Sequence, residues 1–309
     1  MGAPFVRGRF EELPELPRLP HAYARSIARD VAVNSKHFGN IRAHVREFGN
    51  GPPLLLVHGL MTTSYSYRYV LERLGLKYRL LVPDLPGCGS SDKPDTTYGP
   101  AELATFIGEL VDALGIRGCV TVGNSMGGYL CMRAALRDPT LFSKLVNVHS
   151  PAFPELRLHA MNFLLKVPGV AAGLSAFVRR DPLRWVHKNV HYFDESLKSL
   201  EEAHAYGDPL ATTEGVRAFT RYLRDAMSAR GLGEFTNELA QRKQQNLAFP
   251  IPLCLIYSRH DPLVSPTVAE RLAPLIPDAK LHWLENTSHF AHVDTPDAVT
   301  ALVEAFFAG

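Results

Sequence analysis

One short stretch, residues 120–130, constrains the fold more than any other part of the chain. A β-branched apolar run, Val120-Thr-Val122, leads into Gly123-Asn-Ser125-Met-Gly127, and a helical pattern follows as far as Asp138-Pro139. A serine held where a strand turns sharply into a helix sits on strained backbone, and side chains at positions 123 and 127 would clash there. The helix directs its free N–H groups and its positive dipole end at that serine. The stretch therefore predicts a nucleophilic serine on a strand–turn–helix unit.

Apolar runs and helical patterns alternate along both ends of the chain. A run without polar alternation, such as Leu54-Leu-Leu-Val57, indicates a strand covered on both faces, which is typical of a parallel sheet. We expect strands at 31–33, 41–48, 54–57, 79–84, in the run into Ser125, and at 145–148, 253–257 and 280–284. Helices are expected at 65–74, 100–114 and 126–138, then from 266 and from 296, with Thr295 as N-cap and Pro296 in the first turn. The alternation predicts an α/β fold with a mostly parallel, doubly wound sheet.

The alternation stops near Pro151 and resumes at Pro250. Between them no convincing strand occurs, and helical periodicity is best at 156–167 and 216–227. We therefore expect an N-terminal arm (1–30), an α/β core (31–150 and 250–309) and a helical insertion (151–249). The arm is rich in proline, which excludes a continuous helix. It is expected to lie extended with its leucines packed on the domain, the alternative being a PxxP segment that binds an SH3-like module.

A serine hydroxyl needs a base to take its proton and a carboxylate to orient that base. After a serine of this kind the partners follow in the order acid, then histidine, at the carboxyl ends of later strands. Asp261 follows the strand at 253–257 and His289 follows the strand at 280–284, so Ser125, Asp261 and His289 are the predicted triad. The other common position for the acid, after the strand at 145–148, holds His149. His292 is not favoured as the base, because its position three residues further on predicts a helical turn or the surface.

The oxyanion of the reaction needs two backbone N–H donors. Met126, directly after the serine, should supply one, and Leu60 should supply the other because Gly59 lets the chain double back. Met61 is less favoured as that donor, and His58 is expected to brace the loop. The candidates for substrate binding are Met61, His149, Phe163 and Leu164. The insertion offers further apolar side chains for the pocket wall, namely Leu156, Leu158, Met161, Leu165, Val167 and Val170.

Composition limits the partners of the chain. With 33 basic and 31 acidic residues the net charge is +2, which does not indicate nucleic acid or an anionic membrane as a partner. No run of eighteen apolar residues and no secretory signal is visible, and the four cysteines lack metal or framework spacing, so we expect a cytoplasmic protein without a membrane span. No cofactor or metal is expected: Gly87-Cys-Gly89 lacks the rest of a dinucleotide motif, and His187 and His191 lack the glutamate of a zinc helix. The oligomeric state stays open, a homodimer included.

Taken together, these motifs resemble the α/β-hydrolase family from about residue 31 onward. The resemblance rests on His58-Gly59, the stretch from Asp84 to Ser91, Gly123–Gly128, Asp261-Pro262, and His289 followed by Asp294-Thr-Pro296. It implies a Ser-Asp-His triad and an insertion that acts as a cap carrying the substrate pocket. The stretch from His58 to Arg68 is similar to haloalkane dehalogenases and epoxide hydrolases, which use an aspartate nucleophile where this chain has Ser125. The sequence around Ser125 is similar to hydrolases that cleave C–C bonds of ring-fission products, although their Gly-rich oxyanion stretch is missing.

Three functions remain at this stage. The first is a serine hydrolase that cleaves carboxylic esters of small to medium apolar substrates through an acyl-enzyme. The second is a C–C hydrolase, which needs a cation near the substrate carboxylate; Arg179, Arg180 or Arg184 could provide it. The third is a non-enzymatic receptor that keeps the triad. A serine-type perhydrolase or a thioesterase would use the same parts as the esterase.

Overall fold

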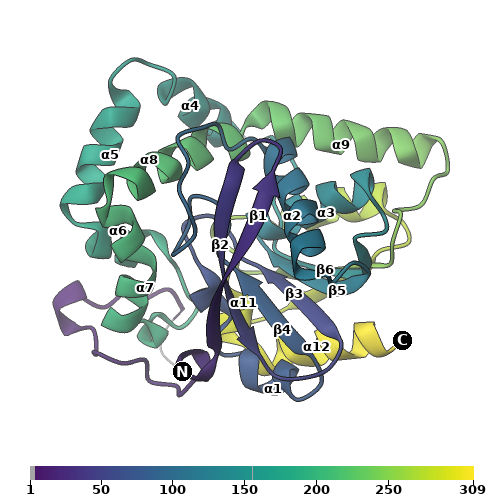
Figure 1. Cartoon of the computed structure of the whole chain (residues 1–309), viewed down its shortest axis with the longest axis horizontal. Helices are drawn as coiled ribbons and strands as arrows, with labels where there is room; N and C mark the ends of the chain where they lie inside the picture. The colour runs from purple at the N-terminus through teal and green to yellow at the C-terminus, as the bar shows by residue number, and fades with distance from the viewer. Residues whose placement is uncertain (1–3, 155) are drawn as a thin grey trace.

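Eight strands form one sheet at the centre of the molecule (Figure 1). The computed structural model describes residues 4–154 and 156–309. In the sheet the strands lie in the order β1-β2-β4-β3-β5-β6-β7-β8. Their bounds are β1 Ile27–Ser35, β2 Gly39–Phe48, β3 Pro53–Val57, β4 Arg79–Pro83, β5 Cys119–Asn124, β6 Phe142–Val148, β7 Leu253–Ser258 and β8 Lys280–Leu284.

The sheet is parallel from β4 to β8 and antiparallel at the β1–β2 edge. This is the predicted α/β-hydrolase architecture, and the expected fold class is confirmed. Strand β1 begins at Ile27, however, and pairs with β2 along its whole length. The last residues of the arm predicted at 1–30 therefore belong to the sheet. The predicted strand 31–33 is short because its first residues, from Ile27 to Asp30, are exposed and carry no apolar alternation.

Alternate residues of the strands enter two separate hydrophobic cores. Leu55 and Val57 of β3 face one core, and Leu54 and Leu56 face the other, as the two-residue period of a strand requires. Helices α2 (Pro100–Leu114), α3 (Met126–Arg137) and α10 (Pro266–Leu272) cover the first face. Helices α1 (Leu71–Gly75) and α12 (Pro296–Ala308) cover the second face, near the short α11 (Ala291–Asp294). The helix expected at 65–74 is a 3₁₀ turn, η3 (Ser64–Tyr67), followed by α1.

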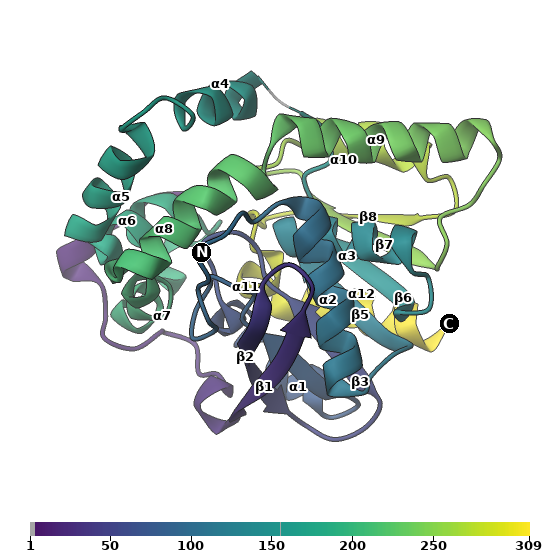
Figure 2. The same cartoon turned by 45° about the horizontal axis from the view of Figure 1, so that its top comes forward.

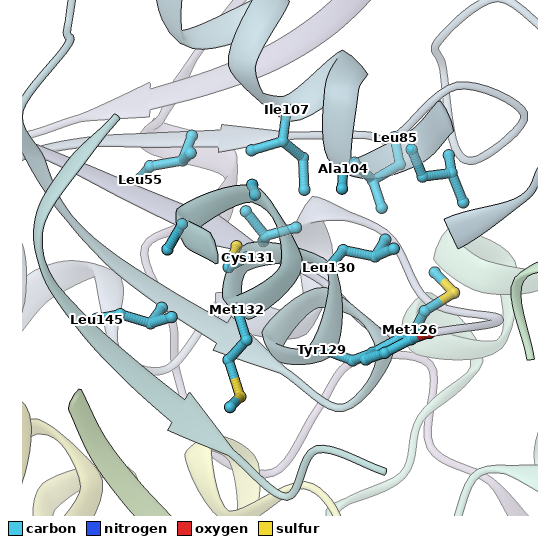
Figure 3. Packing of buried hydrophobic residues seen from close by; sticks show 14 of the residues in the cluster. Leu55, Leu85, Ala104, Ile107, Met126, Tyr129, Leu130, Cys131, Met132 and Leu145 are labelled. Atoms are coloured by element: carbon cyan, nitrogen blue, oxygen red, sulfur yellow. The ribbon is translucent and has the colours of Figure 1, made fainter. Parts of the chain in front are cut away.

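Helix α3 is buried on nearly every side. Figure 3 shows Leu130, Cys131 and Met132 on this helix, packed among side chains of β3, α2 and β6. Residues 126–132 are all buried, as expected for a helix between the sheet and a second helix layer. The packing fixes the direction of α3 and therefore the position of its N-terminus.

Between β6 and β7 the described residues contain helices and no strand (Figure 2). The helices are α4 Leu156–Leu164, α5 Val170–Arg180, α6 Pro182–Asn189, α7 Leu200–Ala211, α8 Thr213–Arg221 and α9 Ala229–Gln244, with a π-helical turn, η5, at Tyr222–Ala226. The helix expected at 216–227 is thus divided into α8 and η5. Helix α9 packs Phe235 against Tyr129 of α3, with ring centres 5.2 Å apart. The last helix of the insertion therefore belongs to the layer that covers the sheet, and we call residues 151–228 the cap.

A buried ion pair connects the cap to the core. Arg68, after η3, donates to Oε2 of Glu202 on α7 at 2.6 Å, and both side chains are almost completely buried. Tyr192 donates to the same carboxylate oxygen at 2.5 Å. The guanidinium lies over the rings of Tyr65 and Tyr69, with centroid distances of 4.6 and 4.4 Å. Breaking such a pair on one side leaves an uncompensated charge in the interior, so this junction resists separation of cap and core.

The N-terminal arm lies along the cap. Its backbone accepts from the first turn of α7, with Leu200 N to Pro14 O at 2.8 Å, and the Gly8 carbonyl contacts His187 Nε2 at 3.1 Å. Arg184 of α6 pairs with Glu11 at 2.7 Å. The arm is therefore packed on the domain, as expected, but through backbone and charged groups and through the rings of Phe5 and Phe10, which contact Phe193 and His187. Leu16 and Leu19 are exposed, in contrast to the expectation that the leucines make the contact.

Candidate active site

Ser125 lies between β5 and α3 with φ 54° and ψ −124°, a strained conformation for a residue with a side chain. The two glycines of the motif, Gly123 and Gly127, allow neighbouring backbone segments to approach closely. A Cβ at Gly127 would come within 2.2 Å of the Val57 carbonyl oxygen, and one at Gly123 within 2.5 Å of Gly128 Cα. The Ser125 N–H donates to Val148 O on the neighbouring strand at 2.7 Å. The turn is thus the sharp strand-to-helix elbow that the sequence predicts.

Asp261 and His289 follow β7 and β8, and the structure brings them together. His289 Nδ1 lies 2.7 Å from Asp261 Oδ2, and both side chains are buried. The other carboxylate oxygen, Oδ1, accepts the N–H groups of Leu263 and Val264 at 2.7 and 2.8 Å. Burial alone would raise the pKa of Asp261, but the charge and hydrogen bond of His289 and these backbone donors outweigh it, and the pKa lies below its usual range. An ionised Asp261 favours the tautomer of His289 with the proton on Nδ1, so that Nε2 can accept a proton.

Asn124, directly before the serine, is a residue that the sequence reasoning missed. Its Nδ2 donates to the backbone carbonyls of His289 at 3.2 Å and Val148 at 3.3 Å. One side chain therefore links the loop that carries the histidine to the strand that carries the serine. Its position at the carboxyl end of β5, where parallel sheets place their functional groups, was the available signal.

The loop after β3 is held in one orientation by His58. Leu85 N–H donates to His58 Nε2 at 3.0 Å, so the ring carries its proton on Nδ1, which donates to Gly59 O at 2.8 Å. The Thr62 hydroxyl donates to the same carbonyl at 3.1 Å. Burial lowers the pKa of His58 and keeps the ring neutral. In a trans peptide the N–H points opposite to the C=O, so the Leu60 N–H is directed away from His58.

Met126 is the first residue of α3, and no side chain caps this helix N-terminus. The N–H groups of the first helical turn have no partner within the helix, so they are available to an anion. Met126 and Leu60 are thus the two donors predicted for the oxyanion. Leu60 lines the same cavity as Ser125 and His289.

That cavity has a volume of about 480 Å³ and lies between the core and the cap. Its apolar wall combines core and cap residues, among them Phe153, Met161, Leu174, Trp185, Phe219 and Met227. Among the described residues no Asp, Glu, Lys or Arg lines it, and Asn124 and Asn189 add the amide groups. An uncharged lining of this kind favours an uncharged, apolar ligand, since a charged one would lose its hydration without compensation.

Only part of the predicted pocket lies at this cavity. Met61 lines it, but Phe163 and Leu164 are 71% and 54% exposed on the outer side of α4, which differs from their expected place in the wall. Helical periodicity cannot tell the inner from the outer side when both are apolar. The side chains of residues 155–159, including Leu156 and Leu158, lie outside the described part of the structure.

His149 and His292 are buried near the triad without lining the cavity. The His149 ring centre is 5.8 Å from that of His289, and burial lowers the His149 pKa to about 4. His292 lies in the short helix α11, which agrees with the expected helical turn, and it is buried rather than at the surface. It stacks on Tyr67 at 4.9 Å, and burial together with Arg68 lowers its pKa to about 3. Both rings therefore stay neutral and add no positive charge beside Asp261 and His289.

The comparisons with known proteins agree with this architecture. A family model described as the alpha/beta hydrolase fold matches residues 52–296, well over half of the chain. The chain belongs to the α/β-hydrolase family. Among described residues of this hydrolase, no group of three or more His, Cys, Asp or Glu side chains could hold a metal ion. In the same part of the chain no helix has the length and hydropathy needed to cross a membrane.

The chain is similar to several members of this family. An uncharacterized hydrolase, YugF, of Bacillus subtilis is 28% identical over 82% of this chain and 89% of its own length. Haloalkane dehalogenase 2 of Mycobacterium tuberculosis is 29% identical over 86% of this chain and 91% of its own length. A solved thermophilic esterase from Thermogutta terrifontis superposes with a TM-score of 0.71 and 19% identity, covering 91% of this chain and 98% of the esterase. The last likeness concerns the fold alone.

Proposed function

We propose that this chain is a serine hydrolase that cleaves carboxylic esters of uncharged, apolar substrates. The observation that carries the proposal is that Ser125 and His289 line one apolar cavity while Asp261 holds His289 Nδ1 from behind at 2.7 Å. One of the relatives is named a haloalkane dehalogenase, and the resemblance to that family implies an aspartate nucleophile at the elbow. Ser125 occupies that position here, and a serine cannot form the alkyl-carboxylate ester on which dehalogenation depends.

In the proposed reaction Ser125 Oγ attacks the ester carbonyl carbon, and its proton passes to His289 Nε2. Asp261 stabilises the imidazolium, and the Leu60 and Met126 N–H groups would bind the oxyanion. When the tetrahedral intermediate collapses, the C–O bond breaks and the proton moves from His289 to the leaving alcohol. Water then attacks the acyl-enzyme with His289 as the base, which releases the carboxylic acid and restores Ser125.

The alternative of C–C cleavage requires a cation near the substrate carboxylate, and no described Lys or Arg lines the cavity. Arg179 donates to Thr213 Oγ1 at 2.7 Å, and Arg184 pairs with Glu11 and Asp181. None of Arg179, Arg180 and Arg184 lines the cavity. A substrate carboxylate at the Ser125 site would find no positive partner among the described residues of the lining, which favours the ester hydrolase.

The test is the hydrolysis of p-nitrophenyl esters from acetate to decanoate. We expect activity with a clear optimum of chain length, and a fall of at least about 10³-fold in kcat/KM for Ser125→Ala. Ser175→Ala, which changes a hydroxyl bonded to the Ala171 carbonyl on α5, is the matched control and should keep full activity. A folded protein without activity on any ester would contradict the proposal.

The uncharged lining gives a sharper version of the same test. An acyl chain that ends in a carboxylate should be hydrolysed at least about tenfold less efficiently than the methyl-ended chain of equal length, because its charge must be buried without a partner. Equal efficiency for the two chains would contradict the assignment of an apolar substrate.

A further inference from the structure

The outer side of α4 and α5 exposes large apolar side chains in an unusual concentration. Phe163 and Leu164 of α4 and Phe177 of α5 are 71%, 54% and 64% exposed, and Val167 between the helices and Val170 at the start of α5 are also exposed. Single exposed apolar residues are ordinary on a protein surface, but a cluster within fifteen residues marks an interaction surface. We call these five residues the cap patch.

Basic side chains border the cap patch. From residue 160 to residue 180 the sequence contains Lys166, Arg179 and Arg180 and no Asp or Glu. All three are exposed, and among the described residues Lys166 and Arg180 have no ion-pair partner. The net charge of +2 for the whole chain hides this local excess, which is why composition did not indicate an anionic surface as a partner. Exposed apolar residues bordered by Lys and Arg are typical of helices that lie at a membrane surface.

A second depression, of about 300 Å³, adjoins the cap patch. Phe177 and Trp185 form its apolar part, and Arg180, Arg184, Lys188 and Asp181 form its polar part. Arg184 is engaged by Asp181 and Glu11, whereas Arg180 and Lys188 have no ion-pair partner among the described residues. Two unpaired cations beside aromatic rings can bind an anionic head group while its chains contact the rings.

The same helices reach the catalytic cavity with their inner sides. Met161 of α4, Leu174 of α5 and Trp185 of α6 line it, whereas Phe163, two residues after Met161, is exposed. Helix α4 is held by Asn162, whose Nδ2 donates to Leu223 O at 3.0 Å and whose Oδ1 accepts from Ala229 N at 2.9 Å. Helices α4 and α5, at the upper left of Figure 1, thus contribute to the wall of the cavity.

We propose that the cap patch docks on the surface of an anionic lipid membrane and that the substrates are apolar esters dissolved in that membrane. The second half of this statement rests on the proposed esterase function, and the first half does not. A second copy of this chain is the other candidate occupant. In a two-fold dimer the same patch meets itself, which would bring Lys166 and Arg180 close to their own copies, and like charges oppose that contact. An anionic surface attracts them instead.

Docking is tested by co-sedimentation with vesicles, using Ser125→Ala so that hydrolysis does not change the lipid. We expect binding to vesicles of phosphatidylcholine with about one third phosphatidylglycerol, and at least about tenfold weaker binding to pure phosphatidylcholine or at high salt. Phe163→Ser combined with Phe177→Ser, and Lys166→Glu combined with Arg180→Glu, should each weaken binding at least about tenfold. Leu76→Ser, at an equally exposed leucine after α1, and Lys243→Glu, at the end of α9, are the matched controls and should bind as well as the parent.

The outcomes separate the two proposals. Binding without hydrolysis of any ester would leave docking intact and contradict the esterase. Hydrolysis of soluble esters without binding to anionic vesicles would contradict docking. The protein could instead form a dimer in vesicle-free solution that the Phe163 and Phe177 changes dissociate. That result would assign the cap patch to a second copy and overturn the proposal of membrane docking. If docking delivers substrate, the patch variants will lose activity on an ester embedded in anionic vesicles and keep it on soluble p-nitrophenyl esters.

Discussion

The loops that carry Ser125, Asp261 and His289 and the cap helices α4 and α5 lie on two sides of one cavity, and they are held in opposite ways. Around Ser125, Asp261 and His289 the linking groups are buried and bonded: Asp261 has three partners, and Asn124 ties the His289 loop to the serine strand. Helix α4 is fastened through Asn162 and turns Phe163 outward. We call the region around Ser125, Asp261 and His289 the dense side and the helices α4 and α5 the sparse side. Closely bonded groups can hold reacting atoms in a fixed arrangement, whereas exposed side chains are available to bind other molecules.

The comparison also explains why the two sides tolerate change differently. A change within a bonded and buried network removes several contacts and leaves partners unsatisfied. A change on the outer side of α4 meets only solvent. The expected effects of substitution should therefore decrease from the triad, through the junction of cap and core, to the outer side of α4.

The largest effect is expected for Asp261→Asn. The amide can no longer fix the proton on His289 Nδ1, so the base is lost at unchanged geometry, and kcat on p-nitrophenyl esters should fall about 10³- to 10⁴-fold with little change in KM. Thermal unfolding checks that the variant is folded. A loss below tenfold would mean that Asp261 does not orient the base, and the contrast between the two sides would lose its strongest support.

The second effect concerns stability. Arg68→Met should lower the free energy of unfolding by about 3–5 kcal/mol, because it leaves Glu202 buried without its cation. Arg73→Met is the matched control. Arg73 pairs with Asp297 and Glu304 at a largely exposed site, so this change should lower the free energy of unfolding by under about 1 kcal/mol. Equal losses in denaturant titrations would show that the cap junction is no more tightly held than the surface.

Much of the dense side could be predicted from the sequence, because local rules decide it. The strand–turn–helix serine, the Asp261 and His289 positions after β7 and β8, and the glycines of the elbow follow from steric limits and strand ends that show in a few residues. His292 shows the limit of those rules, because its helical turn could be predicted but its burial could not. Tyr67 from η3 stacks on that ring, and no pattern near residue 292 records this contact.

The sparse side could not be predicted in the same detail. Helices α4 and α5 are apolar on both sides, so their period gives no direction, and Met161 rather than Phe163 lines the cavity. The cavity also depends on Trp185 and Phe219, which come from helices whose mutual packing is non-local. The buried pair of Arg68 and Glu202 lies 134 positions apart in the chain, and neither residue is marked by its neighbours.

The third effect depends on pH. The His292 pKa is about 3 in the folded chain against its ordinary 6.5, so between these values the unfolded chain binds a proton that the folded chain does not. Stability should therefore fall as the pH falls through this window, with a His292 contribution of the order of 5 kcal/mol over the whole window. His292→Phe should remove that part of the acid sensitivity, and His204→Phe, at an exposed histidine, should not. Identical pH profiles of the unfolding free energy for the parent and His292→Phe would contradict the assignment.

The smallest effect is expected on the outer side of α4. Phe163→Ser should change the free energy of unfolding by less than about 0.5 kcal/mol, because the ring makes few contacts that folding would lose. Leu165→Ala, two residues along the same segment but buried, is the matched comparison and should cost about 2 kcal/mol or more. A substantial loss for Phe163→Ser in solution would mean that the ring is covered by the protein itself, which would remove it from the cap patch. If Phe163→Ser leaves the free energy of unfolding unchanged, we infer that Phe163 serves binding by the cap and not folding. A large exposed apolar side chain that does not stabilise the fold is otherwise a liability in water.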